Sequence, residues 1–468
     1  MRCRIRWNII VYVGLTAFAL ILFVFNVGYK SIEAQFITIS PQISIAIEQN
    51  PKKLWNRVET SLNQLSGFSD IQCDAILSGN SEAAEKAKQW YFPFQDASKI
   101  WNEIEESYDQ CQTLKEFFVF PELPFTVEEA EYPLAYGALV HKDITQVTYL
   151  LSSIYRPNNV YAFVVDGKAS IDFKRRINIL SDCLPNVYVQ HTTVVRWCGY
   201  EIVRSVFNTV RLLAGLKQQW KYFQYLSGVD LPLKTNLEMT RIFKTLNGAF
   251  ISEISEFQNR RLFNISATSP LPLFKSSLSA TFSRESADYM ISSAMVSNLL
   301  SYLKNTKCPD ESIWTTIAGN PDLLPLPGGF NASALLTRRK KEIKEGHNSF
   351  TDPEITRPNN NTFIPTQYYI SRYQVWKPSP NCKGKYVASS CVFGVDDLPI
   401  LISRPELVVH KLYFDYQPAT YFCLLRQHWQ RSLNIELQQK FNADSYQNLA
   451  QVKAVNGEPL DKIRFYYK

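Results

Sequence analysis

The sequence has 468 residues, of which 46% are hydrophobic, 20% are charged and an unusually high 13% are aromatic. Because this composition provides enough apolar surface to offset the entropy lost on folding, it excludes a disordered, collagenous or low-complexity protein. The net charge of +7 comes from 50 Lys and Arg against 43 Asp and Glu, which is too small and too evenly spread to favour nucleic-acid binding. The length predicts one large domain or two ordinary ones.

A membrane anchor is predicted at the N-terminus. Residues 7–27 carry no charge and are long enough to cross a hydrocarbon core of about 30 Å as a helix. An uncleaved transmembrane anchor is favoured over a cleaved signal peptide, because the apolar run is long and bulky residues follow it. Arg2, Arg4 and Arg6 place residues 1–6 in the cytosol by the positive-inside rule, so the rest of the chain is expected to face a lumen or the exterior.

The nine cysteines suit an oxidising compartment. Cys3 precedes the anchor, and the other eight occur singly, without the C-x-x-C pair that would indicate zinc, so disulfide bonds are predicted. N-glycosylation sequons at Asn264, Asn331 and Asn360 also fit the secretory pathway, although three in this length are compatible with chance.

Residues 28–113 have the pattern of helices, which predicts a stem that merges into packed helices. Short apolar runs then alternate with amphipathic segments, which predicts a parallel sheet buried on both faces by helices of ten or more residues. Strands are expected at 134–140, 160–165, 187–190 and 220–226, and helices at 144–154, from 171 onward and at 201–213.

Ligands of a parallel sheet bind at the carboxyl ends of its strands, so Asp166 and the turn at 227–230 are predicted to face a site. Asp143 is expected to cap the first helix. The sequence has no G-x-G-x-x-G after its first strand and no P-loop, G-x-S-x-G or H-E-x-x-H motif, so the common sites that use these motifs are excluded.

A polar segment at 337–361 contains the charged run 338–345. We interpret this run as a solvated surface loop in preference to a patch for an acidic partner. The segment is expected to be an insertion within the domain.

Four stretches in a fixed order resemble the core-2/I-branching β-1,6-N-acetylglucosaminyltransferases of the Golgi. They are EAEYPLAYGALVHKD with IYRPNNVYAFVVDGKAS, WKYFQYLSGVDLPLKTN, SPLPLFKSSLSATFSRESADYMI with CPDESIWTTI, and SSCVFGVDDLPIL followed by Lys411. The resemblance implies an α/β, GT-A-like (Rossmann-like) catalytic domain at 114–468, behind the anchor and a helical stem. It also implies a single-pass type II Golgi membrane protein whose catalytic domain is lumenal.

The resemblance further implies inverting transfer of a sugar from a UDP donor to a glycan hydroxyl, without a metal ion or other cofactor. Such a displacement needs a base for the hydroxyl proton and positive charge beside the departing diphosphate. By resemblance Glu311, next to Asp310 in the P-D-E-x-x-W segment, is the base, and Lys411 binds the diphosphate. The lack of a convincing Asp-x-Asp after a strand agrees with a metal-free mechanism.

One position departs from the family at the diphosphate. The family has an arginine three residues before the cysteine of the CVFG segment, and this chain has Ala388 there. Alanine cannot supply the bidentate phosphate clamp of arginine. Either Lys383 or Lys385 replaces the arginine, or donor affinity is reduced, the donor differs, or the chain is inactive.

The resemblance assigns further residues to the donor and to the acceptor. Pro378 stands where the family has a second aromatic residue after Trp376, so acceptor specificity does not carry over. A helix cap is the alternative role for Asp166. The donor side comprises Leu139, Asp166 and Trp197, and the acceptor side Glu253, Trp376 and either Arg260 or Arg261.

Disulfide pairing is also implied by the resemblance. One family bridge has lost both cysteines, at Ala162 and Thr209. Cys198 and Cys308 are left over, either as free buried thiols or as a bridge peculiar to this chain. The implied pairs are Cys73 with Cys423, Cys111 with Cys183, and Cys382 with Cys391.

We therefore expect a Golgi transferase that adds a sugar, most simply N-acetylglucosamine from its UDP donor, in β-1,6 linkage to an O-glycan on a glycoprotein. Two alternatives stay open: transfer of glucose or xylose, and a catalytically inactive glycan-binding or scaffolding relative, which Ala388 favours. The expected partners are the UDP-sugar, the glycan acceptor and the membrane, with no nucleic acid, and a homodimer is left open.

Overall fold

The computed structural model of the chain describes residues 50–263, 268–344 and 369–463. The predicted cytosolic tail and anchor lie outside the described residues, as do the sequons at Asn264 and Asn360. Within the described ranges no helix is both long and apolar enough to cross a membrane. All of them fall within one compact unit, Ile47–Lys468.

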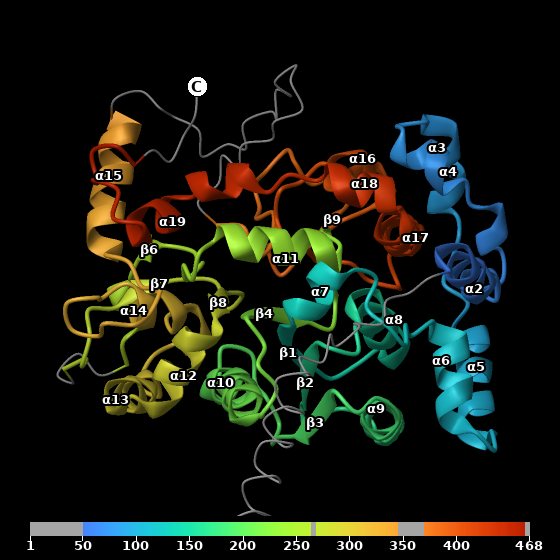
Figure 1. Cartoon of the computed structure of the whole chain (residues 1–468), viewed down its shortest axis with the longest axis horizontal. Helices are drawn as coiled ribbons and strands as arrows, with labels where there is room; N and C mark the ends of the chain where they lie inside the picture. Colours follow the sequence, from blue (N-terminus) through green and yellow to red (C-terminus); the bar gives the residue numbers. More distant parts are fainter. Residues whose placement is uncertain (1–49, 264–267, 345–368, 464–468) are drawn as a thin grey trace, which may run out of the picture. The chain divides into compact units, whose positions relative to one another are not determined.

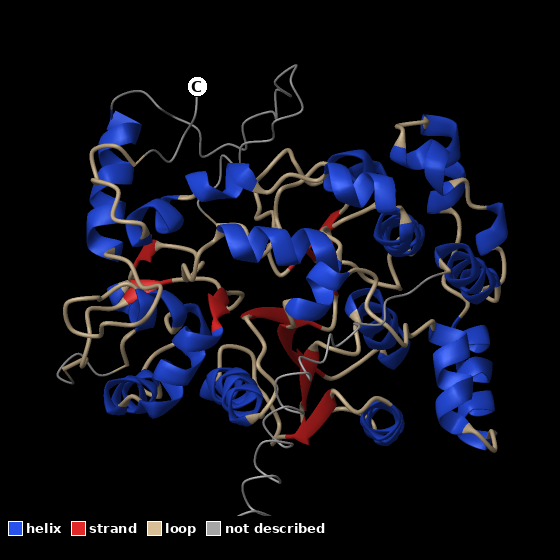
Figure 2. Ribbon diagram, in the orientation of Figure 1, coloured by secondary structure: helices blue, strands red, loops and turns tan. Residues whose placement is uncertain are grey.

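A five-stranded sheet with the order β3-β2-β1-β4-β8 forms the centre of this unit (Figures 1 and 2). The four strands predicted from apolar runs are present and parallel, and β8 adds to β4 in the antiparallel direction, so the prediction of a mixed α/β fold with a mainly parallel sheet is confirmed. The strands are β1 (Leu134–Val140), β2 (Val160–Val165), β3 (Val187–His191), β4 (Tyr222–Ser227) and β8 (Thr281–Ser283).

The start of β4 differs from the prediction. The strand begins at Tyr222 and not at Trp220. Trp220 is instead buried, and its indole nitrogen donates a hydrogen bond to the Leu213 carbonyl oxygen at 2.9 Å. Trp220 is therefore bonded to the helix that packs on the sheet and is not part of the strand.

Helices cover both faces of the sheet, because side chains along β1 alternate between two core clusters. α8 (Ile144–Ile154) and α9 (Ile171–Cys183) pack on one face, and α10 (Tyr200–Gly215) packs on the other (Figure 1). The approach of α10 is so close that a Cβ on Gly137 would lie 2.6 Å from the Thr209 hydroxyl oxygen. Glycine is therefore required in the middle of β1.

Asp143 does not cap α8 as expected. Its backbone is left-handed, with φ of 56°, and its side chain makes no capping hydrogen bond. Its carboxylate instead lies 3.6 Å from the Lys142 ammonium. The backbone conformation, which the residue type alone does not specify, turns the carboxylate away from the helix.

The helices before the sheet belong to the same core. Their buried residues join the cluster that also contains α8, α9 and α17. Two disulfides, Cys73–Cys423 and Cys111–Cys183, join them to α17 and α9. These helices are α2 (Pro51–Asn63), α3 (Cys73–Leu77), α4 (Ser81–Lys88), α5 (Phe94–Glu106), α6 (Gln110–Phe118) and α7 (Val127–Glu131).

Short hairpins and helices complete the described fold. The antiparallel pairs are β5 (Asp230–Pro232) with β11 (Val408–His410), β6 (Ser255–Glu256) with β7 (Phe274–Lys275), and β9 (Lys385–Val387) with β10 (Ser390–Val392). The remaining helices are α11 (Asn236–Thr245), α12 (Arg284–Ser292), α13 (Ala294–Leu303), α14 (Trp314–Ala318), α15 (Ala332–Lys344), α16 (Leu398–Leu401), α17 (Ala419–Leu433), α18 (Ile435–Lys440) and α19 (Ala450–Val455). Five 3₁₀ turns lie at Phe68–Asp70, Asn259–Arg261, Pro309–Glu311, Val395–Asp397 and Asp444–Asn448.

The prediction of a surface loop for the charged run 338–345 is wrong over its described part, which belongs to α15. Arg338 donates to the Ile463 carbonyl oxygen at 3.0 Å, and Arg339 donates to the Ile254 carbonyl oxygen at 2.9 Å. Both arginine side chains are therefore hydrogen-bonded to backbone carbonyl oxygens of distant segments.

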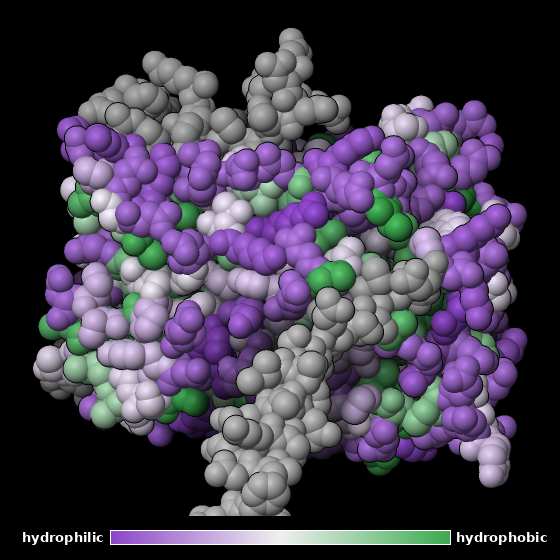
Figure 3. All heavy atoms as spheres, viewed as in Figure 1, coloured by the Kyte–Doolittle hydropathy of each residue, from purple (hydrophilic) through white to green (hydrophobic). Residues whose placement is uncertain are grey.

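The surface drawn in Figure 3 is mainly hydrophilic, with hydrophobic residues in small separate groups.

Candidate active site

The predicted donor residues Leu139 and Asp166 lie at the carboxyl edge of the parallel strands. Leu139 of β1 lies in register with Val164 of β2 and with Ser227 of β4, so the three strands end at one edge. Leu139 is itself half-buried there. This edge is where a doubly covered parallel sheet binds its ligands.

Asp166 follows β2 at this edge and is 2% exposed. Its carboxylate accepts hydrogen bonds from the Lys168 and Val195 amides at 3.0 and 2.9 Å, and it lies 3.1 Å from the Lys168 ammonium. Burial alone would raise the pKa of Asp166, but these contacts outweigh burial and hold the pKa below its usual value. Asp166 is not the cap of α9, because Ser170 caps that helix. It orders the loop that carries Trp197, which is 84% exposed.

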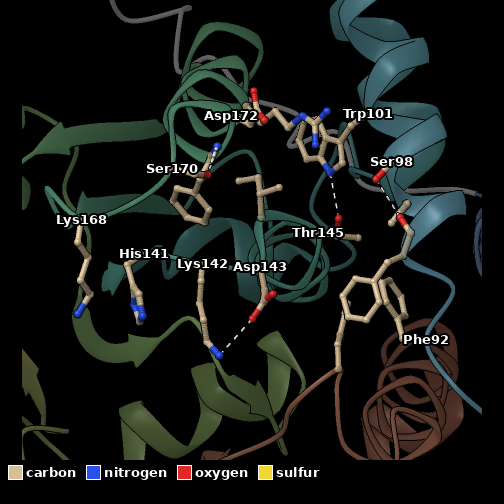
Figure 4. A pocket seen from close by; sticks show the side chains of 16 residues that line it. Phe92, Ser98, Trp101, His141, Lys142, Asp143, Thr145, Lys168, Ser170 and Asp172 are labelled. Atoms are coloured by element: carbon tan, nitrogen blue, oxygen red, sulfur yellow. Dashed lines mark hydrogen bonds and ion pairs between the residues drawn. The ribbon is translucent and has the colours of Figure 1, made fainter.

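A cavity of about 600 Å³ opens beside the ends of β1 and β2 (Figure 4). Figure 4 shows His141, Lys142 and Lys168 extending in the same direction along one side of it. The ammonium groups of Lys142 and Lys411 approach the same Tyr413 ring, at 4.9 and 5.4 Å, so the cavity adjoins Lys411. Its other side is aromatic, lined by Phe92, Phe94, Trp101, Phe173 and Phe414.

The predicted turn at 227–230 holds a histidine that sequence reasoning missed. Asp230 is fully buried and accepts hydrogen bonds from the Ser227 amide at 2.8 Å and from His410 Nδ1 at 2.6 Å. Burial, together with the charge of Arg372, lowers the pKa of His410 to about 4, so its ring is neutral at pH 7. The turn thereby holds His410, the residue that immediately precedes Lys411, in place.

Lys411 is 7% exposed, and its ammonium donates a hydrogen bond to the Val387 carbonyl oxygen at 3.0 Å. Burial, then the charge of Arg372 and then that of Lys142, lower the pKa of Lys411. Among the described residues no carboxylate forms an ion pair with its ammonium. Because a buried charge is costly without a counter-charge, Lys411 is suited to bind an anion.

Ala388 lies beside Lys411, at the two-residue tip of the β9–β10 hairpin. Ala388 and Ser389 both have positive φ, of 49° and 64°, and Val387 precedes them. The two lysines suggested as replacements for the missing arginine are exposed. The Lys385 ammonium lies 4.3 Å from the Tyr416 ring centre, and the Lys383 amide donates to Asp397 Oδ1 at 2.9 Å.

Arg372 is the second residue that sequence reasoning missed. The segment 370–376 runs beside β11, where the Tyr373 amide donates to the Val408 carbonyl oxygen at 2.7 Å. Arg372 Nη2 donates to Gln374 Oε1 at 2.8 Å and to Ser277 Oγ at 3.2 Å. After burial, the charge of Arg372 is the next cause of the lowered pKa of Lys411, and it opposes the rise in the pKa of Asp310 that burial causes.

Glu311 ends the 3₁₀ turn Pro309–Glu311, and its side chain is about one-third exposed (32%). Its Oε2 atom lies 2.5 Å from Arg261 Nη2 and 3.7 Å from the Lys275 ammonium. Asp310 next to it is buried, and burial followed by the charge of Glu311 raises the pKa of Asp310 to about 6. The two adjacent carboxyl groups thus have different environments, and the accessible one is held by two cations.

The structure brings one predicted acceptor residue into contact with this carboxylate. Arg261 contacts Glu311 directly, whereas Arg260 is exposed. Glu253 is half-buried, and its charge contributes to the raised pKa of Tyr369. Trp376 is 54% exposed and shares a face with Arg372, since residues 371, 373 and 375 alternate with them as buried residues.

Four disulfides are present in the described chain. The three pairs implied by the resemblance are bonded as expected: Cys73–Cys423, Cys111–Cys183 and Cys382–Cys391. The alternative left open for the remaining two is also decided, because Cys198 is bonded to Cys308. This bridge joins the loop of Trp197 to the residue before the Pro309–Glu311 turn.

Two further predictions concern a metal and a glycan. Within the described ranges, no three His, Cys, Asp or Glu side chains are grouped so that they could hold a metal ion, and the absence of a cofactor stays a prediction. Asn331 is exposed, and its side-chain oxygen accepts a hydrogen bond from the Ala334 amide at 2.9 Å. Glycosylation of Asn331 also stays a prediction.

Part of the chain matches a family model, and most of it is similar to known glycosyltransferases. The family model "Core-2/I-Branching enzyme" matches residues 134–341. The beta-1,3-galactosyl-O-glycosyl-glycoprotein beta-1,6-N-acetylglucosaminyltransferases of Homo sapiens and Bos taurus are 27% and 29% identical, each over 76% of this chain and 84% of its own length. A human protein named as the probable seventh enzyme of this kind is 25% identical over 77% of this chain and 82% of its own. Residues 134–341 therefore match a core-2/I-branching enzyme domain, and the chain is a glycosyltransferase.

Proposed function

We propose that the chain transfers N-acetylglucosamine from its UDP donor, with inversion, to a β-1,6 position of an O-glycan on a glycoprotein. The carrying observations are an accessible carboxylate, Glu311, held by Arg261, and a buried cation, Lys411, that has no ion-pair partner among the described residues. The names of the relatives support the transferred sugar, the linkage and the glycoprotein acceptor.

The chemistry follows from these two groups. Glu311 removes the proton from the acceptor hydroxyl as its oxygen forms a bond to the anomeric carbon of the donor. The bond between that carbon and the diphosphate breaks in the same step, and the negative charge of the departing UDP is stabilised by Lys411. A single displacement inverts the configuration, so an α-linked donor gives a β-linked product. Arg261 and Lys275 orient the Glu311 carboxylate.

We further propose a GT-A-like catalytic domain behind a single transmembrane helix at 7–27, in a type II orientation in the Golgi. The parallel sheet with its site at the carboxyl edge supports the fold. The charge-free run and the three arginines before it support the anchor and its orientation. Protease protection of the full chain in sealed Golgi vesicles tests the orientation, because only residues 1–6 should be accessible from outside.

The experiment that tests the activity is turnover of UDP-N-acetylglucosamine, UDP-glucose and UDP-xylose with a panel of O-glycan acceptors. For Glu311→Gln we expect kcat to fall by about 10²–10⁴-fold, the usual contribution of a general base, with UDP affinity unchanged. Arg211→Gln, an exposed arginine near the end of α10, is the control. Turnover by Glu311→Gln equal to that of the natural chain would contradict the proposal.

Two measurements separate the alternatives. We expect EDTA to leave turnover and UDP binding unchanged, because cationic side chains stabilise the diphosphate in the proposed site. An inactive scaffolding role, favoured by Ala388 alone, predicts no UDP binding by calorimetry. The donor panel distinguishes N-acetylglucosamine from glucose and xylose.

A further inference from the structure

Lys411 and Arg372 are two cations in one site, and among the described residues no carboxylate forms an ion pair with either. Lys411 is almost fully buried, and Arg372 is half-buried. The Nε atom of Arg372 is buried and has no hydrogen-bond partner in the described chain. Since buried charges and buried donors are costly when unpaired, this site is built for an anion with several acceptor atoms.

The backbone fixes the two cations next to each other. The His410 amide donates to the Tyr373 carbonyl oxygen at 2.8 Å, which sets the register between the segment of Arg372 and the strand that ends before Lys411. Burial, followed by the charge of Arg372, lowers the pKa of Lys411. Like charges are held together here by the fold and not by contact with each other.

The hairpin tip that touches Lys411 supplies no cation. Ala388 and Ser389 form the tip, and the contact to Lys411 is made by the backbone oxygen of Val387. Arg372 approaches from the segment that also carries Trp376. A positive charge is therefore present at the site although the hairpin lacks an arginine.

We propose that Arg372 binds the diphosphate of the nucleotide donor together with Lys411, in place of the arginine that the family carries at the position of Ala388. The inference rests on the proposed function, because it takes the donor to be a nucleoside diphosphate sugar. The planar guanidinium can donate two parallel hydrogen bonds to phosphate oxygens. Its Nε–H has no hydrogen-bond partner among the described residues and can donate one of these two bonds.

Other nearby cations are engaged elsewhere. The Lys142 ammonium is half-exposed and lies 3.6 Å from the Asp143 carboxylate. The Lys168 ammonium lies 3.1 Å from the Asp166 carboxylate. Arg372 differs from both because its own hydrogen bonds go to neutral oxygens, on Gln374 and Ser277.

The test is calorimetric titration of the full chain, purified in detergent, with UDP and with uridine. For Arg372→Gln we expect UDP affinity to fall by about 10–100-fold, the usual loss for a charged hydrogen bond. Uridine affinity should stay unchanged, because uridine has no phosphate. Arg372→Lys should recover part of the loss, and Arg211→Gln should bind UDP like the natural chain.

A second variant removes the positive charge at position 372 and introduces one on the hairpin, at position 388. In the double variant Arg372→Gln/Ala388→Arg we expect UDP affinity to return to within about 10-fold of the natural chain, because the clamp is restored from the other side. Ala388 already has a left-handed backbone, so the larger side chain adds no new backbone strain. Recovery would show that the loss in the single variant was a loss of charge and not of folding.

The outcomes separate the inference from the function on which it rests. If the natural chain does not bind UDP, the proposed function fails. If the natural chain binds UDP and Arg372→Gln binds it equally well, the inference is overturned and the function stands. An equal loss of UDP and uridine affinity would also overturn the inference, because it would indicate a structural role for Arg372.

Discussion

At the scale of single residues, neighbouring side chains of the same type have different chemistry. Asp310 and Glu311 are adjacent, but Glu311 is accessible and paired with Arg261, whereas Asp310 is buried and its Oδ1 atom has no partner among the described residues. Burial and the charge of Glu311 raise the pKa of Asp310 to about 6. The Glu311 carboxylate is thus accessible to a substrate, whereas ionisation of the buried Asp310 carboxyl group is unfavourable.

This difference makes a pH-dependent contribution to stability. The folded pKa of Asp310 lies above the value of 3.8 expected for the unfolded chain, so the folded state binds more protons between pH 4 and 6. The cost of ionising Asp310 is therefore absent at low pH and is fully present above pH 6. For Asp310→Asn we expect a gain of about 1–3 kcal/mol at pH 7.5 and no gain at about pH 3, below both pKa values. Thermal unfolding at both pH values checks this, and an equal effect at both would contradict it.

At the scale of elements, the Cys198–Cys308 bridge connects the two sides of the site. It joins the loop of Trp197, which Asp166 orders, to the turn of Glu311. The proposed nucleotide side and the proposed base are thereby tied by a covalent link that the resemblance did not specify. The bridge closes a chain segment with a sequence separation of 110 residues, against 9 for Cys382–Cys391.

Removal of these two bridges should have unequal effects. The loss of loop-closure entropy in the unfolded chain grows with loop length, so Cys198→Ser/Cys308→Ser should destabilise the protein by about 2 kcal/mol more than Cys382→Ser/Cys391→Ser. Urea unfolding without reductant measures both. An equal or reversed order would show that local packing, and not chain entropy, decides what each bridge contributes.

At the scale of the whole molecule, the catalytic unit includes helices that the sequence assigned to the region of the stem. Trp101 and Ile104 of α5 are fully buried in the core cluster that contains α8 and α9. Cys73 and Cys111 are bonded to residues deep in the catalytic part. The helices from residue 51 onward therefore carry part of the stability of the sheet.

Truncation tests this organisation. A chain that begins at residue 50, placed behind a cleavable signal peptide, should be secreted, folded and able to bind UDP, because it keeps the whole described unit. A chain that begins at residue 114 should misfold, because it leaves Cys183 and Cys423 without partners and exposes the surface that α5 covers. Secretion and UDP binding of the two forms provide the measurement. Binding by the shorter form would place the stability of the site in residues 114–468 alone.

Local sequence patterns predicted the elements more fully than the site. The four parallel strands were predictable because their apolar runs are buried on both faces, as the alternating contacts of β1 require. The charged run in α15 was misinterpreted because its partners, Ile254 and Ile463, are remote in sequence. Arg372 and His410 were missed for the same reason. His410 is adjacent to Lys411 but bonds to the remote Asp230, and the segment of Arg372 pairs with the strand before Lys411 across a gap in sequence, which leaves no local signal.

The Cys73–Cys423 bridge has a consequence for the order in which the chain is made. Its two cysteines are 350 residues apart in the sequence. At a synthesis rate of about 5–20 residues per second, Cys73 emerges about 20–70 seconds before its partner exists. During that interval the thiol can react with Cys111 or Cys183, so a correct bridge depends on protection or later exchange. Production of this enzyme is therefore expected to rely on disulfide isomerases, whichever sugar it transfers.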